Sequence, residues 1–80
     1  MTGGIVELDL HGMNIYQAQI AIDAALRRAG SGTYRLRLIH GYRGGTAIRD
    51  MLWTTYTHRG QVKRLVTIHD GVTDLVLREF

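Results

Sequence analysis

The chain has 80 residues, and we predict a single domain over 1–80 with a core of about 5–79. It contains no cysteine, so disulfides and thiolate metal sites are excluded. Ten basic residues against seven acidic ones give a net charge of +3, a balance that is compatible with a nucleic-acid partner but does not demonstrate one.

The sequence carries no sign of a membrane or secretory protein. No segment approaches the roughly 18 consecutive apolar residues of a membrane span, and residues 1–4 lack the basic and apolar regions of a signal peptide. Small secreted domains commonly carry disulfides, which are absent here. We therefore expect a cytoplasmic protein without a membrane partner. The sequence indicates no oligomeric interface, so we expect a monomer.

The first half of the chain predicts a strand, a helix and a second strand. Residues 5–10 alternate apolar and acidic side chains from Val6 onward, as a half-buried strand does. Asn14 is suited to cap the following helix, with Gln17 completing a capping box, and Gly30 to follow its last turn. Residues 34–38 alternate again. The expected apolar face of the helix consists of Ile15, Ala18, Ile22, Ala25, Leu26 and Ala29.

The second half predicts a helix over 46–59 and strands over 62–68 and 73–79. Asp70–Gly71 between these strands favours a tight turn and an antiparallel hairpin. The order is βαβαββ, which predicts a small α/β fold. Strands joined by helical crossovers are parallel, so the first three strands share a direction. Their carboxyl ends then meet at one edge, where open α/β sheets bind ligands.

Three strands end in a histidine at this edge: His11, His40 and His69. Catalytic zinc can use three histidines. Two of the ligands, however, usually come from one helix or short loop, whereas here each comes from a separate loop. We therefore predict no metal site, and we interpret His69 as a residue of the hairpin turn.

Asp9 and His11 are two residues apart, so their side chains leave the same face of a strand. A carboxylate in this position can hold the imidazole in one tautomer, which prepares a general base. The alternative is a solvated ladder of ion pairs that joins Glu7 and Asp9 to Arg35 and Arg37 on the neighbouring strand. We prefer the ladder for Glu7 and the functional interpretation for Asp9.

The second turn, residues 40–46, is rich in glycine and opens a helix. Exposed amides at a helix start attract anions, glycines allow close approach, and Arg43 adds a bidentate contact. A turn without a ligand is the alternative, but the position beside Asp9 and His11 favours a phosphate site. The predicted phosphate-binding residues are Gly12, Gly41, Arg43, Gly44, Gly45, Arg49, Arg35 and Arg37.

Two side chains of the second helix lie outside these roles. Trp53 falls off the apolar stripe, and the sequence does not distinguish packing against Phe80 from an exposed contact. His58 lies near the helix C-terminus, where a cation is favourable to the helix dipole, so we interpret it as structural.

These turns resemble a known family, the Smr (small MutS-related) domain. Leu8-Asp9-Leu10-His11-Gly12 resembles its first motif, L-D-L-H-G, and His40-Gly41 followed by glycines resembles its second, H-G-x-G. The segment Gly71-x-Thr73-x-Leu75-x-Leu77 resembles its closing strand. The resemblance covers Val6 to Leu77. The second loop is one residue longer than the family pattern, so we expect the following helix to start in a different direction.

The resemblance implies a two-layer α+β sandwich like the C-terminal domain of bacterial translation initiation factor three. Its four-stranded mixed sheet would have the order 1-2-4-3, with two helices on one face. It implies binding of DNA or RNA, and endonuclease activity in several members. It also implies that Asp9 and His11 act in cleavage, and that His40, Gly41 and Gly44 act in substrate contact or activity.

Three functions are consistent with these observations. The first is an endonuclease with Asp9, His11 and His40 as catalytic residues. RNA would need no cofactor, because its 2′-hydroxyl is a nucleophile, whereas DNA would favour Mg²⁺ on Asp9. The second is a nucleic-acid structure-binding module without catalysis, and the third is a protein-interaction adaptor with a vestigial site. The convergence of histidine–glycine turns on one edge favours the first two.

Overall fold

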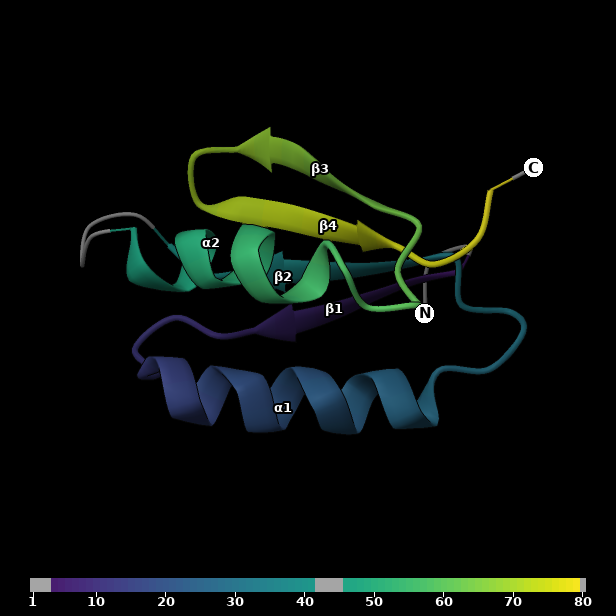
Figure 1. Cartoon of the computed structure of the whole chain (residues 1–80), viewed down its shortest axis with the longest axis horizontal. Helices are drawn as coiled ribbons and strands as arrows, with labels where there is room; N and C mark the ends of the chain where they lie inside the picture. The colour runs from purple at the N-terminus through teal and green to yellow at the C-terminus, as the bar shows by residue number, and fades with distance from the viewer. Residues whose placement is uncertain (1–3, 42–45, 80) are drawn as a thin grey trace.

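The computed structural model describes residues 4–41 and 46–79, which form a four-stranded sheet and two helices (Figure 1). The elements in chain order are β1 (Ile5–Asp9), α1 (Ile15–Arg28), β2 (Arg35–Ile39), α2 (Ala47–Met51), η1 (Leu52–Tyr56), β3 (Arg64–His69) and β4 (Val72–Val76).

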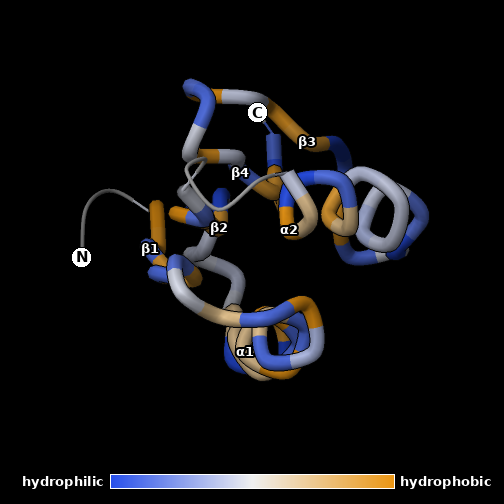
Figure 2. Tube along the Cα trace, turned by 90° about the vertical axis from the view of Figure 1, so that its left-hand side faces the viewer, coloured by the Kyte–Doolittle hydropathy of each residue, from blue (hydrophilic) through white to orange (hydrophobic). Residues whose placement is uncertain are grey.

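The strand order in the sheet is β1-β2-β4-β3. β1 and β2 are parallel, and β4 is antiparallel to both β2 and β3. The first three strands therefore share a direction, and their carboxyl ends lie together on the left of Figure 1. Viewed along the strands, both helices cover the same face of the sheet (Figure 2). The α+β fold, the strand order and the common direction that were expected are confirmed.

The core lies between this face and the helices. Leu36 and Leu38 of β2 point into it and are buried, because alternate side chains of a strand share a face. The capping box of Asn14 and Gln17 starts α1 as predicted. Four of the six expected apolar residues of α1 are buried, Ala18, Ile22, Ala25 and Leu26. Ile15 is exposed, since the first turn of α1 extends past the end of β1 (Figure 1).

The second helix differs from the single α-helix predicted over 46–59. It begins as α2 and continues from Leu52 to Tyr56 as the π-helical turn η1. The hydroxyls of Thr54 and Thr57 donate to the carbonyls of Asp50 and Trp53, four residues earlier. Hydroxyls that compete for these carbonyls bend helices, which gives a local reason for the departure from α geometry.

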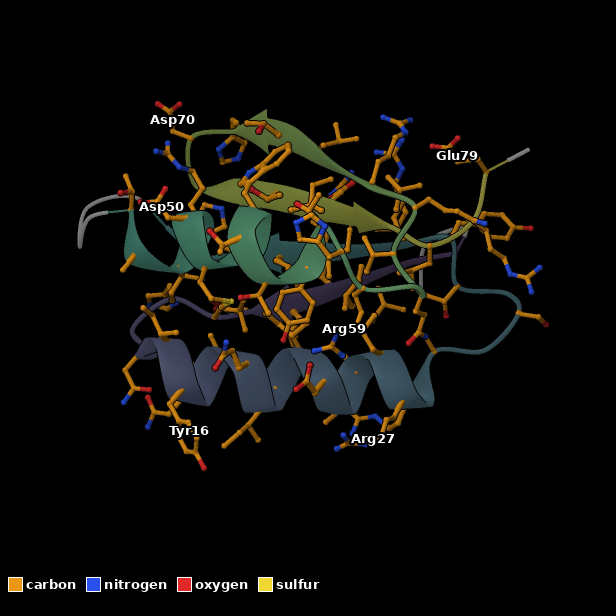
Figure 3. The ribbon with its side chains drawn as sticks, viewed as in Figure 1. Tyr16, Arg27, Asp50, Arg59, Asp70 and Glu79 are labelled. Atoms are coloured by element: carbon orange, nitrogen blue, oxygen red, sulfur yellow. The ribbon has the colours of Figure 1, made fainter. Side chains whose placement is uncertain are left out.

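Tyr56 fastens this helix to α1. It is fully buried, and its hydroxyl donates to Asp23 Oδ1 at 2.8 Å. Arg59 donates to the same oxygen at 3.0 Å and lies 4.9 Å from the centre of the Tyr56 ring; Figure 3 shows Arg59 between the two helices. Burial raises the pKa of Tyr56 well above its usual range, so the hydroxyl stays protonated as a donor.

The other face of the sheet holds a buried carboxylate, Asp74. It pairs in register with Arg37 of β2. The guanidinium of Arg37 donates to both of its oxygens at 2.9 and 3.0 Å, and Arg35 donates at 3.2 Å. The prediction that Arg35 and Arg37 pair with Glu7 is therefore wrong, because the carboxylate that binds both arginines is Asp74. Glu7 only adds to the effect of Asp74, whose hydrogen bond raises the pKa of Arg37.

We predict that Asp74→Asn destabilises the domain by about 3 kcal/mol, because it leaves two guanidiniums without their carboxylate. The value is at the low end of the range for buried pairs, since both arginines keep some contact with water. Urea unfolding measures the change. Asp50→Asn, at an exposed position, is the matched control, with an expected change within about 0.5 kcal/mol. Equal losses in the two variants would contradict the role given to Asp74.

Candidate nucleic-acid site at the carboxyl edge of the sheet

The first turn of the site begins where β1 stops pairing. The Leu10 amide donates to the Ile39 carbonyl at 2.8 Å, which extends the parallel pairing one residue past Asp9. The Met13 amide then donates to the Leu10 carbonyl at 3.0 Å and closes a four-residue turn. Gly12 is its third residue with φ +81°, the conformation that a type II turn requires there. The turn holds His11 at the tip of the edge.

Asp9 fixes both the backbone and the ring of His11. Its Oδ1 accepts the His11 amide at 3.1 Å and lies 2.9 Å from Nδ1. Because an ionised carboxylate only accepts hydrogen bonds, Nδ1 carries a proton, and in the neutral ring Nε2 then has the lone pair. The His11 side chain is 74% exposed. The two hydrogen bonds from His11, that of the ring first, hold the pKa of the Asp9 carboxyl below its usual value.

The second turn lies directly beside the first. Gly41 has φ +73°, and a Cβ added to it would stand 3.8 Å from the Cβ of His11. The amides of His40 and Gly41 both donate to the carbonyl of Gly71, at 2.9 and 3.0 Å. The ends of β1 and β2 and the β3–β4 turn are thus joined in one edge, as the sequence predicted.

His40 occupies a different environment from His11. It is only 8% exposed. Its Nδ1 lies 2.8 Å from the Gly41 carbonyl and its Nε2 lies 3.0 Å from the Thr73 hydroxyl. With both ring nitrogens engaged inside the protein, the geometry favours a positioning role over the catalytic one expected from the sequence. His69 Nδ1 accepts the Gly71 amide at 3.2 Å, which agrees with a turn residue.

The predicted phosphate ligands are divided among three places. Gly12 and Gly41 lie at this edge. Arg49, with a side chain that is 42% exposed, lies beside it in a groove that Asp70 also lines. Arg35 lies five residues before His40, about 16 Å away along the strand, on the opposite face from the helices. The structure therefore does not bring Arg35 and Arg37 to the edge, and their contact with phosphate stays a prediction. The remaining three, Arg43, Gly44 and Gly45, lie outside the described residues.

Two contributors to this edge were not among the predicted site residues. Gly71 supplies the carbonyl that joins the turns, and Thr73 holds the His40 ring. Both belong to the hairpin that the topology inserts beside β2. The alternation of β4 could have predicted that Thr73 faces the core, because Thr73 shares a face with the core residue Leu75.

Within 4–41 and 46–79, no three histidine, cysteine, aspartate or glutamate side chains are grouped so that they could hold a metal ion. No helix within those same ranges has both the length and the apolar character needed to cross a membrane.

Comparisons with known proteins agree with this architecture. Residues 8–73 match the family model for the Smr domain. The structure is similar to the crystal structure of the Smr domain of Thermus thermophilus MutS2, with a TM-score of 0.81. The two are 30% identical, over 92% of this chain and 99% of that chain. No curated protein matches. The family resemblance expected from the sequence is confirmed.

We predict that Gly41→Ala destabilises the domain by about 1–2 kcal/mol, because φ +73° is strained for a residue with a side chain. The added methyl meets His11 only at ordinary contact distance, so the cost comes from the backbone. Gly32→Ala is the control, since no atom of another described residue beyond its chain neighbours lies within 4 Å of its Cβ position and its φ is not positive. Thermal or urea unfolding that ranks the two variants equally would contradict a left-handed Gly41.

The pairing with His11 affects the titration of the Asp9 carboxyl. Its lowered pKa keeps it ionised to a lower pH than in the unfolded chain, so its contribution to stability is present above the unfolded pKa and is lost as pH falls through the folded one. An NMR pH titration should find the Asp9 pKa below its ordinary value. His11→Ala should move it back upward, and His58→Ala should leave it in place. A value that does not respond to His11→Ala would show that the pair does not form.

Proposed function

The chain belongs to the Smr domain family, whose members bind nucleic acids, and from the geometry of its edge we propose that it is an endonuclease that cleaves phosphodiesters. The observation that carries this proposal is the Asp9–His11 pair. The carboxylate holds the ring by Nδ1, and the exposed ring leaves Nε2 to take a proton from a bound substrate.

RNA is the substrate that this pair can cleave without a further group. His11 Nε2 takes the proton of a 2′-hydroxyl, and the 2′-oxygen attacks the adjacent phosphorus. The bond from phosphorus to the 5′-oxygen breaks, and the leaving oxygen receives a proton from the imidazolium. The products are a 2′,3′-cyclic phosphate and a 5′-hydroxyl. Asp9 stabilises the imidazolium between the two proton transfers, as a carboxylate does beside a catalytic histidine.

The surroundings of the pair allow a phosphate backbone to approach. Among the described residues, apart from the chain neighbours of Gly12, no atom lies within 4 Å of the position where a Cβ of Gly12 would stand. Arg43 is the arginine predicted to contact the phosphate here, since Arg49 lies 3.7 Å from Asp50 Oδ1. Arginine suits this task, because its planar fork matches phosphate oxygens.

DNA would require a different nucleophile. Without a 2′-hydroxyl, a water molecule must attack, and a divalent ion is the usual means of activating it. Asp9 is the carboxylate at this edge that would bind such an ion. We favour RNA because its cleavage uses only groups that the edge already holds in place.

One observation favours a second candidate, a nucleic-acid-binding module without catalysis. His40, the expected partner of His11 in catalysis, has both ring nitrogens engaged inside the protein. The Asp9–His11 pair must then serve first as base and afterwards as acid. A binding module uses the same edge and depends on the charge and openness of the surface rather than on Nε2.

We predict that His11→Ala lowers RNA cleavage by at least about 100-fold, the usual contribution of a general base, while RNA affinity changes little. Asp9→Asn should lower cleavage by a smaller factor, because the ring keeps Nε2 but loses its orientation. His58→Ala, an exposed histidine outside the edge, is the matched control. Labelled RNA and DNA are incubated with each variant in Mg²⁺ and in EDTA, and the termini of the products are identified.

Each outcome distinguishes the candidates. Cleavage in EDTA that yields cyclic phosphate and disappears in His11→Ala supports the proposed RNA mechanism. Cleavage of DNA that requires Mg²⁺ supports the metal route through Asp9. Intact substrates with salt-sensitive binding leave the binding module. Intact substrates without any binding would remove nucleic acid from the function of this edge.

A further inference from the structure

A groove separate from the Asp9–His11 pair opens between the second helix and the tip of the β3–β4 hairpin. Its volume is about 540 Å³, within the range of pockets that hold small organic groups. Six residues line it: Arg49, Asp50, Trp53, Thr54, Thr67 and Asp70. Figure 3 shows Asp50 and Asp70 facing the same end of the molecule from the two sides of this region.

An aromatic side chain stands at the wall of the groove. Trp53 is 43% exposed, although burial of its large indole ring in the core would be favourable. It belongs to η1, the π-helical turn, and such turns occur frequently at functional sites. An accessible indole offers a flat face on which any nucleobase can stack, whatever its sequence.

The charges of the groove select a base over a phosphate. Asp50 and Asp70 repel an anion, and Arg49, the basic residue of the lining, lies 3.7 Å from Asp50 Oδ1. Carboxylate oxygens and the hydroxyls of Thr54 and Thr67 instead accept hydrogen bonds from the amino and imino groups on a base edge. The groove is therefore unsuited to the backbone of a nucleic acid and suited to an unpaired base.

We propose that this groove is a stacking subsite for an unpaired base of the nucleic acid, with Trp53 as the platform. The inference rests on the proposed function and adds a substrate class to it: a single strand, loop or flap rather than a continuous duplex. In a duplex the bases are stacked on one another and their faces are closed to Trp53.

The position of the groove allows one nucleic-acid strand to occupy both the groove and the Asp9–His11 site. Asp70 is followed by Gly71, whose carbonyl binds the amides of His40 and Gly41, and Gly41 packs beside His11. β1 and β4 are separated by β2 alone, so their ends lie roughly 10 Å apart at the usual strand spacing. A base in the groove would thus belong to a nucleotide near the one whose phosphate lies at His11.

The chain has a single tryptophan, so its fluorescence reports this groove alone. The test titrates the protein with a fluorescein-labelled single-stranded RNA, and with the same RNA annealed to its complement. Anisotropy of the fluorescein label measures binding. A second titration with unlabelled RNA measures contact with Trp53 through quenching of the tryptophan fluorescence. We expect quenching by the single strand and little by the duplex.

Variants separate stacking from general binding. Trp53→Ala should weaken single-strand binding on the order of tenfold and duplex binding much less, while Trp53→Phe keeps a ring and should recover most of the affinity. Tyr16→Ala removes another exposed aromatic, on the outer side of α1 (Figure 3), and should change nothing.

Failure of this inference is distinguishable from failure of the proposed function. Cleavage or salt-sensitive binding that is identical in the native chain and in Trp53→Ala, without quenching, would overturn the subsite and leave the endonuclease intact. Single-strand binding that depends on Trp53 supports the subsite even where no cleavage occurs. Absence of all binding by the native chain would overturn both.

Discussion

The parallel register of β1 and β2 is the constraint on which the site depends. It places Asp9 opposite Ile39 and lets the Leu10 amide bind the Ile39 carbonyl. The two turns that follow therefore leave the sheet at the same level, with Gly41 against His11. A slip of one residue would move Asp9 to the face covered by the helices and bring Leu8 to the other face. The burial of the apolar residues thus fixes the chemistry of the edge.

The same dipeptide, histidine–glycine, has opposite uses in the two turns. His40 continues the alternation of β2 after Leu36 and Leu38, so its ring lies on the covered face, where Thr73 receives it. His11 lies past the end of β1 in a turn, and its ring is held by Asp9 in solvent. His40 positions the loop, and His11 is available to a substrate. The two residues are of the same type, and the exposure of their rings separates their roles.

The sequence predicted those features that depend on neighbours along the chain. The alternation in β1, the cap at Asn14, the hairpin at Asp70–Gly71 and the Asp9–His11 pair are all of this kind. Periodicity did not reveal contacts between strands that are distant in the sequence, although the family resemblance implied the strand order itself. Asp74 takes the arginines of β2 because β4 is inserted between β2 and β3, and periodicity alone left Glu7 as the nearest carboxylate. The widening of the second helix depends on hydroxyls whose rotamers no pattern reveals.

The count of ten basic residues overstates the positive charge available to a nucleic acid. Arg35 and Arg37 are bound to Asp74, Arg59 to Asp23, and Arg64 to Glu79. These guanidiniums would lose their carboxylates by turning to phosphate, and for Arg35 and Arg37 that carboxylate is buried. An edge with few available charges gains less affinity from the backbone, so it has more need of contacts to the bases. Unpaired bases are what protein surfaces read in single-stranded RNA, and an accessible indole beside the Asp9–His11 edge is a surface that can read them.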